Sequence, residues 1–363
     1  MDVPSSPLTL DARLSLVLAA MRATLDAHLP AGPYRELSGR LVTGVARQAG
    51  SAVERLGWMP FINLPFDVTA AAGGNPSLAV ELAAASAFVF SGLDVIDDIA
   101  DGDCQPQWEG VPQAQQTLAG ISAMVSFPQL LIASLPLPPA QIAAMLALLA
   151  QRMLQAGAGQ QFDLALVGAE QPDPDTVVAS VAGKSGEQLA LYCEWAALAA
   201  GAGAETVAAW GDYGSALGIA AQIQSDMSEL CHDAWCRDLA SGNRTLPIAY
   251  HLQKAGPARI GFLALLALAR TDLEAQRAVR QTLFDSGAIR MAALVAQLYV
   301  ERGRRALQRA GAREPGLSRL TALLDGPDKK RMDPTPLNSL ATPAATPGLT
   351  VEAAFNLQER TKA

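Results

Sequence analysis

Long stretches of this chain carry apolar residues three and four positions apart, a spacing that places them on one face of an α-helix. Alanine and leucine supply most of these residues, and both are strong helix formers. Half of the 363 residues are hydrophobic, whereas the alternating patterns typical of strands are scarce. We therefore expect an all-α protein whose long helices pack against one another in an antiparallel bundle.

Clusters of proline and glycine mark the ends of the expected helices. The predicted helices span residues 9–29, 34–56, 77–101, 112–127, 139–169, 174–200, 204–230, 245–255, 258–270, 272–284 and 286–311. The composition changes at both ends of the chain. We expect a flexible N-terminus at 1–8, an all-helical domain at 9–325, and a mobile tail rich in proline, threonine and alanine at 326–363.

Charge and hydropathy argue against several classes of protein. The net charge is −8 and no long run rich in lysine or arginine is present, so we expect no nucleic-acid partner. Prolines break the apolar stretch 130–150, and the apolar run 260–269 is well short of the about 20 residues of a spanning helix. The N-terminus lacks the pattern of a signal peptide. We therefore expect a cytoplasmic protein without a transmembrane segment.

The stretch 91–103 is the most informative motif, because its acidic residues share one face of a predicted helix. These residues are Asp94, Asp97, Asp98 and Asp101. Like charges at this spacing repel one another, and no lysine or arginine lies nearby to pair with them. A solvated acidic helix end is the simpler interpretation. Magnesium ions, which take oxygen ligands from one or two carboxylates and from substrate phosphates, would explain the pattern better.

A second polar face lies at 220–230, where Gln222, Asp226 and Glu229 fall on one side of a helix. By itself this is typical of a surface helix. Two isolated cations, Lys184 and Arg244, add weight to it. Two acidic clusters with two cations describe a site for a diphosphate that is held by magnesium.

At this point the sequence resembles the polyprenyl synthetase family, the trans-isoprenyl diphosphate synthases. The similarity covers about residues 40–325 and rests on five segments in the family's order. These are DDIAD at 97–101, GQQFDL at 159–164, Lys184-Ser185, GIAAQIQSDMSE at 218–229 and DLASGNRTLPIAY at 238–250. The resemblance implies an all-α class I isoprenoid synthase fold, a single large bundle whose two acidic motifs face a central cavity. It also implies an isoprenoid diphosphate substrate, three Mg²⁺ ions and a homodimer.

The resemblance assigns roles to individual residues. Asp97, Asp98 and Asp101 would bind two magnesium ions. Asp226, with Gln222 and Glu229, would bind the third. Lys184 and Arg244 would bind diphosphate oxygens. The residues that we expect to line the cavity are Phe90, Gly92, Leu93, Trp108 and Gln160.

The chain also departs from the family pattern. Residues 57–74 and 102–116 contain no lysine or arginine, although the family's cations for isopentenyl diphosphate lie in these two regions. Ser225 and Glu229 replace two aspartates of the second motif, and Asn243 stands where the family has lysine. The cations missing from 57–74 and 102–116 are the ones that would hold isopentenyl diphosphate, the acceptor of chain elongation.

Four interpretations follow from these losses. The leading one is ionisation of an allylic diphosphate, such as farnesyl or geranylgeranyl diphosphate, followed by cyclisation or rearrangement as in terpene synthases. The second is a prenyltransferase that uses isopentenyl diphosphate or another acceptor. The third is a non-catalytic partner subunit or a prenyl-binding protein, and the fourth is an unrelated helical scaffold.

Overall fold

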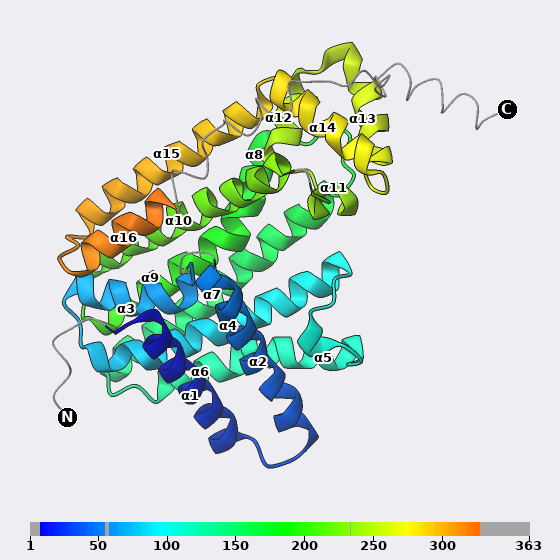
Figure 1. The fold of residues 1–363 in the computed structure, drawn as a ribbon. Helices are drawn as coiled ribbons and strands as arrows, with labels where there is room; N and C mark the ends of the chain where they lie inside the picture. Colours follow the sequence, from blue (N-terminus) through cyan, green and yellow to red (C-terminus); the bar gives the residue numbers. More distant parts are fainter. Residues whose placement is uncertain (1–7, 55–57, 233, 327–363) are drawn as a thin grey trace. The chain divides into compact units, whose positions relative to one another are not determined.

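The computed structural model describes residues 8–54, 58–232 and 234–326, and every regular element in these ranges is helical (Figure 1). The α-helices are α1 (Leu10–His28), α2 (Pro33–Glu54), α3 (Pro60–Ala72), α4 (Ala79–Asp101), α5 (Gln113–Ile121), α6 (Phe127–Ala133), α7 (Pro139–Leu166), α8 (Pro174–Val181), α9 (Glu187–Ala199), α10 (Ala204–Cys231), α11 (Arg237–Ser241), α12 (Leu246–Lys254), α13 (Arg259–Leu268), α14 (Leu273–Asp285), α15 (Ala288–Arg309) and α16 (Gly316–Asp325). Short 3-10 turns form η1 (Pro76–Leu78), η2 (Pro106–Trp108) and η5 (Gly256–Ala258), and π turns form η3 (Ser122–Ser126) and η4 (Ala182–Gly186). The predicted all-α class is confirmed.

The chain divides into two compact units. Among the described residues, unit 1 holds 8–54, 58–156, 186–217 and 302–326, and unit 2 holds 157–185, 218–232 and 234–301. Helices α7, α10 and α15 each contribute residues to both units. The predicted flexible segments 1–8 and 326–363 lie outside the described residues, apart from Leu8 and Gly326. That 9–325 folds as one domain stays a prediction.

Most of the predicted helices are confirmed to within a few residues, and their differences from the prediction are local. The predicted helices 112–127 and 174–200 are interrupted by the π turns η3 and η4, and the first continues as α6 to Ala133. Three helices, α3, α11 and α16, were not predicted. Helices α11 and α16 have five and ten residues, which is too short for a clear apolar periodicity.

Helix α3 was missed because it contains two prolines. Pro60 lies at its first turn, where the missing N–H costs nothing, but Pro65 lies inside the helix and removes one hydrogen bond. Burial of Phe61, Ile62 and Leu64, each at most 3% exposed, offsets this loss.

Helix α4 is the central helix of unit 1, because it contacts α1, α2, α3, α5, α6 and α9. Its N-terminal half carries four fully buried alanines, which allow the neighbouring helices to pack closely: Ala83, Ala84, Ala85 and Ala87. Gly92 marks the closest approach. A Cβ atom at Gly92 would lie 2.6 Å from Met124 Cγ and 2.7 Å from the carbonyl oxygen of Gly120. Small residues therefore set the crossing of α4 with α5 and η3.

A buried ion network ties the C-terminal part of unit 1 to its N-terminal part. The carboxylate of Asp67 on α3 is 3% exposed and accepts hydrogen bonds from two arginines. Its Oδ1 lies 2.9 Å from Arg13 Nη2 of α1 and 2.6 Å from Arg319 Nε of α16. Both guanidinium groups compensate the buried charge, so the network fixes α1 and α16 to α3.

Unit 2 is built around two apolar clusters. In one of them Ile219, Ile223 and Met227 of α10 pack against Ala292 and Ala296 of α15. The other cluster joins α12, α13 and α14. Because α10 buries the face that carries residues 219, 223 and 227, its neighbouring face is left for the polar residues of the second motif.

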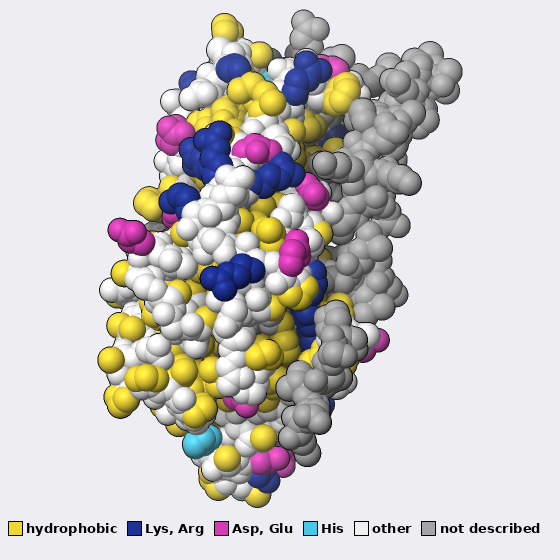
Figure 2. Space-filling model, turned by 90° about the vertical axis from the view of Figure 1, so that its left-hand side faces the viewer, with side chains coloured by type: hydrophobic (Ala, Val, Ile, Leu, Met, Phe, Trp, Pro, Cys, Tyr) yellow, Lys and Arg dark blue, Asp and Glu magenta, His cyan; other side chains and the backbone are white. Residues whose placement is uncertain are grey.

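Three helical segments are long and apolar enough to cross a membrane by length and composition, among the described residues. They are Pro76–Asp101, Gln113–Ala133 and Pro139–Leu166. The prolines at 136–139 do separate the last two, as expected, but each segment alone reaches the required length. Pro76–Asp101 is mostly buried within the protein, whereas the other two are mostly not. Figure 2 shows hydrophobic side chains at many points of the face that it draws.

We expect Gly92→Ala to destabilise the protein, because the new methyl group would collide with Met124 and with backbone of α5. The cost should be about 1–3 kcal/mol of unfolding free energy, as for other overpacked sites. Gly39→Ala on α2 is the matched control, since no atom lies within 4 Å of its Cβ position, and it should stabilise the protein slightly. Urea unfolding of both variants measures the difference. Equal stability of the two variants would show that position 92 faces open space.

Candidate active site

The first acidic cluster lies at the C-terminal end of α4 in unit 1. The helix ends at Gly102, whose φ of +74° is left-handed, and the N–H groups of Gly102 and Asp103 both donate to the carbonyl of Asp98. This turn directs the following loop back, so that the side-chain amide of Gln105 lies 3.5 Å from Asp98 Oδ1. Asp97 and Asp98 are half-buried, and Asp101 is exposed.

The position of this cluster makes its negative charge costly. The C-terminal end of a helix already carries partial negative charge, which disfavours carboxylates there. The pKa of Asp94 is raised to about 7, mainly by burial and then by the charges of Asp98 and Asp97, while a hydrogen bond with Gln48 lowers it. Gln48 belongs to α2, and the sequence did not predict its contact with Asp94, because no local pattern indicates contacts between residues far apart in the chain. The cluster therefore favours binding of cations.

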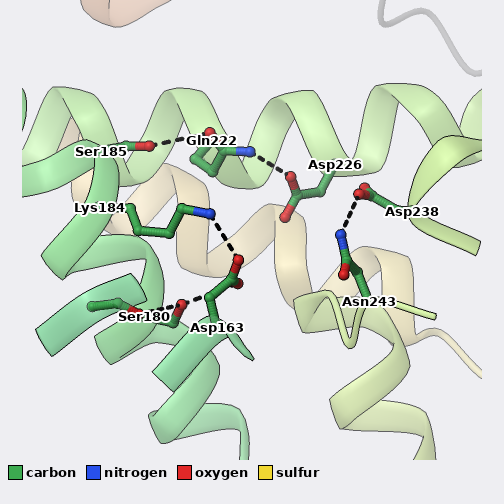
Figure 3. A network of polar contacts seen from close by, with 9 residues as sticks. Asp163, Ser180, Lys184, Ser185, Gln222, Asp226, Asp238 and Asn243 are labelled. Carbon is green, nitrogen blue, oxygen red and sulfur yellow. Dashed lines mark hydrogen bonds and ion pairs between the residues drawn. The ribbon is translucent and has the colours of Figure 1, made fainter. Parts of the chain in front are cut away.

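The second cluster lies in unit 2 and consists of several groups of hydrogen-bonded polar side chains (Figure 3). Ser185 donates to Oε1 of Gln222 over 3.1 Å, and Nε2 of Gln222 donates to Oδ1 of Asp226 over 2.8 Å. Lys184 Nζ lies 2.7 Å from Asp163 Oδ2, and Ser180 donates to the same carboxylate over 3.2 Å. The structure therefore brings together Lys184, Gln222 and Asp226, and adds Asp163 of the segment 159–164.

A close contact between two backbones positions Lys184 in this network. A Cβ atom at Gly159 of α7 would lie 2.6 Å from the backbone of Gly183 and 2.7 Å from the backbone nitrogen of Lys184. The π turn η4 interrupts the helix at this point. Such turns often occur at functional sites because they change the direction of side chains. Glycine at 159 and the π turn at 184 together place the lysine against Asp163.

Asp226 is the most strongly perturbed acid of this cluster. Its pKa is raised to about 8, mainly by burial and then by the charges of Asp238, Glu229 and Asp163, whereas the hydrogen bond from Gln222 lowers it. The second motif therefore places four carboxylates near one another, on α7, α10 and α11. A divalent cation would relieve their repulsion.

The two cations of unit 2 that were predicted to bind diphosphate, Lys184 and Arg244, contact protein groups. Lys184 is paired with Asp163. Arg244 donates through Nε to the carbonyl of Ala169 over 2.8 Å and through Nη1 to the carbonyl of Gly242 over 3.1 Å. Burial, followed by the charge of Arg270, lowers the pKa of Arg244. Asn243 donates to Asp238 over 3.2 Å, where the family has a lysine. Diphosphate binding by Lys184 and Arg244 stays a prediction.

The residues predicted to line the cavity have different surroundings. Phe90 stacks on Phe61, with 4.2 Å between ring centroids, and Gly92 lies at the helix crossing described above. Trp108 is buried in η2, while Leu93 is half-buried. Gln160, in unit 2, is also half-buried. The first motif belongs to unit 1 and the second to unit 2, so a cavity that both face stays a prediction.

The carboxylate sets fit a hard divalent cation that arrives together with an anion. Among the described residues, no three acidic, histidine or cysteine side chains already form a complete metal-binding group. Mg²⁺ rarely needs one, because it retains waters and commonly takes one or two carboxylates plus substrate phosphates. Asp97, Asp98 and Asp101 in unit 1, and Asp226 with Glu229 in unit 2, carry oxygen atoms of the kind that Mg²⁺ takes as ligands.

Comparisons with known proteins agree with this chemistry. The family model "Polyprenyl synthetase" matches residues 66–283. Geranylfarnesyl diphosphate synthase of Aeropyrum pernix is 30% identical over 182 residues, which cover 48% of this chain and 56% of that protein. The chain thus spans about half the length of this curated relative.

Solved structures share the fold. Polyprenyl synthetase from Streptomyces coelicolor A3(2) matches with a TM-score of 0.72 and 20% identity, over 87% of this chain and 97% of that one. Geranylgeranyl pyrophosphate synthetase from Pyrococcus horikoshii Ot3 matches with a TM-score of 0.72 and 22% identity, also over 87% and 97%. The isoprenoid synthase fold expected from the sequence is therefore confirmed.

We expect the stability of the metal-free protein to fall between pH 5 and pH 8 because of Asp226. The pKa of Asp226 is raised in the folded state, so in this pH range the folded protein keeps a proton that the unfolded chain has already released. The stabilisation that comes from this difference in proton binding is lost as the pH approaches 8. The slope from this group is at most about 1.4 kcal/mol per pH unit. Asp226→Asn should remove this part of the slope, whereas the exposed Asp212→Asn should retain it. Urea unfolding at each pH, with chelator, measures both, and equal slopes would contradict the raised pKa.

Proposed function

The chain belongs to the polyprenyl synthetase family, and we propose that it transfers an allylic prenyl group from its diphosphate to isopentenyl diphosphate. The observation that supports this most directly is the polar network of unit 2, in which Asp226 lies near three other carboxylates, one of which, Asp163, pairs with Lys184. Such a site suits a metal-bound diphosphate. The network lies within the matched range 66–283.

The comparisons favour prenyl transfer over the cyclisation that the sequence suggested first. The relatives named above are, by their names, synthases of linear prenyl diphosphates or polyprenyl synthetases. Cyclisation was inferred from the missing cations at 57–74 and 102–116, and the absence of one set of cations does not exclude another. Elongation is therefore the better-supported interpretation, with farnesyl or geranylgeranyl diphosphate as the proposed donor.

We propose Mg²⁺ as the cofactor, with three ions in the loaded enzyme. Bound there, the ions supply positive charge to the diphosphate oxygens as negative charge develops on them. Asp97, Asp98 and Asp101 would hold two of them. Asp226, with Gln222 and Glu229, would hold the third. Lys184 would share its charge between Asp163 and a diphosphate oxygen.

The proposed reaction is balanced in bonds and charge. The bond between C1 of the donor and the diphosphate oxygen breaks, and its electron pair leaves with the diphosphate. The double bond of isopentenyl diphosphate forms the new carbon–carbon bond to C1, and the product then loses one proton. The side chains around the donor chain must exclude water from the allylic cation, and the apolar composition of α4 suits that role.

We also propose that the protein is a homodimer. Leu118 and Ile121 of α5 and Val125 of η3 are 51%, 49% and 41% exposed, and their spacing places them along one side of the α5–η3 segment. An exposed apolar stripe of this kind is typical of an interaction surface. Burial against a second copy would remove it from water.

Incubation with Mg²⁺, farnesyl diphosphate and isopentenyl diphosphate should give longer prenyl diphosphates, and Asp98→Asn should reduce turnover by about 100-fold or more, as for loss of other charge-stabilising groups. Asp103→Asn is the control, because Asp103 is exposed and lies beyond the end of α4. Product analysis by chromatography and mass spectrometry distinguishes the alternatives. A cyclic hydrocarbon formed without isopentenyl diphosphate would contradict elongation, and the absence of any product would support a binding protein.

Light scattering on the eluting protein should give about twice 37.9 kDa for the wild type. The double variant Leu118→Glu with Ile121→Glu should elute as a monomer, because it would bury two charges in an apolar contact. Leu16→Glu, at an exposed leucine of α1, is the control and should remain dimeric. A wild-type monomer would contradict the proposed dimer.

A further inference from the structure

One face of α2 is in contact with the acidic end of α4 and with the loop that follows it. Arg40 Nη1 donates to the backbone carbonyl of Gln107 over 2.7 Å. The side-chain amide of Gln107 lies over Gly44, at 3.0 Å from a Cβ position there. One helical turn further, Gln48 forms a hydrogen bond with Asp94. These contacts show that α2 packs beside the C-terminal part of α4 and beside the loop that follows it, within unit 1.

Two arginines lie on this face of α2. With 3.6 residues per turn, positions 40, 44, 47 and 48 fall within a sector of about 100°. Arg47 immediately precedes Gln48, which places the Cα atom of Arg47 near the level of Asp94 along the helix axis. The side chains of Arg40 and Arg47 are both exposed. Arg40 retains guanidinium donors beyond the one that its bond to Gln107 uses.

A second diphosphate next to the first motif needs its own positive charge. The metal ions proposed for the carboxylates would already be engaged with the donor diphosphate. The stretches 57–74 and 102–116, on either side of α4, contain no lysine or arginine. The cations for a second diphosphate must therefore come from another element, and α2 presents two that are two helical turns apart.

We propose that Arg40 and Arg47 bind the diphosphate of the acceptor substrate, isopentenyl diphosphate. This inference rests on the proposed elongation activity. Gln107 is a positioning residue in this arrangement, because its carbonyl fixes the guanidinium of Arg40 and its amide covers Gly44. Two guanidinium groups from one helix bind the terminal and the bridging region of the same diphosphate.

Steady-state kinetics on Arg40→Ala and Arg47→Ala tests the proposal. Each variant should raise KM for isopentenyl diphosphate about 10- to 100-fold, as expected for one charge-assisted hydrogen-bonding group. KM for the allylic diphosphate should change less than about threefold, since the loss affects one substrate. Arg47→Lys should restore part of the affinity. Arg35→Ala, on the same helix but paired with Asp26, is the matched control and should behave as the wild type. Thermal unfolding confirms that each variant is folded.

The possible outcomes separate this proposal from the proposed function. An unchanged KM for isopentenyl diphosphate in both variants of an active enzyme overturns the role of the arginines and leaves elongation intact. If the wild type has no elongation activity, calorimetric titration with isopentenyl diphosphate alone decides. Binding that weakens about tenfold or more in Arg47→Ala supports the site. Binding of equal strength in the variant, or no binding by the wild type, overturns it.

Discussion

The repulsion among carboxylates held partly away from water is the constraint on which both acidic clusters depend. Asp94 in unit 1 and Asp226 in unit 2 have pKa values raised mainly by burial and then by neighbouring acids. Without a ligand, such carboxyl groups avoid the cost of buried negative charge by retaining protons. When a divalent cation is present, they release the protons and bind the cation. Each cluster is thus unfavourable as a set of charges and favourable as a set of metal ligands, which is the property a reversible metal–diphosphate site needs.

The surrounding packing keeps the acids in these costly positions. In unit 1, the left-handed Gly102 ends α4 directly after Asp101, and the α4 crossing at Gly92 fixes the helix against α5 and η3. In unit 2, the backbone contact at Gly159 and the π turn η4 hold Lys184 against Asp163. In both units a glycine, which has no side chain, allows neighbouring helical segments to approach closely. The packing of the fold thereby holds together groups that would otherwise move apart.

Local features of the sequence predicted the local features of the structure. The apolar spacing predicted most helices, and the spacing of Asp97, Asp98 and Asp101 predicted their common helix. Long-range contacts left no such pattern: Gln48 meets Asp94 and Arg40 meets Gln107 only because α2 packs beside α4. Gly92 is a related case. It was expected to line the cavity, and the structure shows that it lies in close contact with Met124 and Gly120, which no local pattern indicates.

The distribution of cations agrees with the different requirements of the two proposed diphosphates, one of which leaves during the reaction while the other is only bound. The diphosphate that leaves the donor gains charge during the reaction, so it needs the concentrated charge of metal ions. The diphosphate of an acceptor keeps its charge unchanged from binding to product. Hydrogen-bonded guanidinium groups are sufficient for such a group, because they hold it without having to respond to the reaction. In unit 2 the cations Lys184 and Arg244 are engaged with protein oxygens, so the proposed metal ions would supply most of the positive charge there. The arginines of α2 are exposed, and the acceptor diphosphate proposed to lie there has only to be bound, because none of its bonds is cleaved.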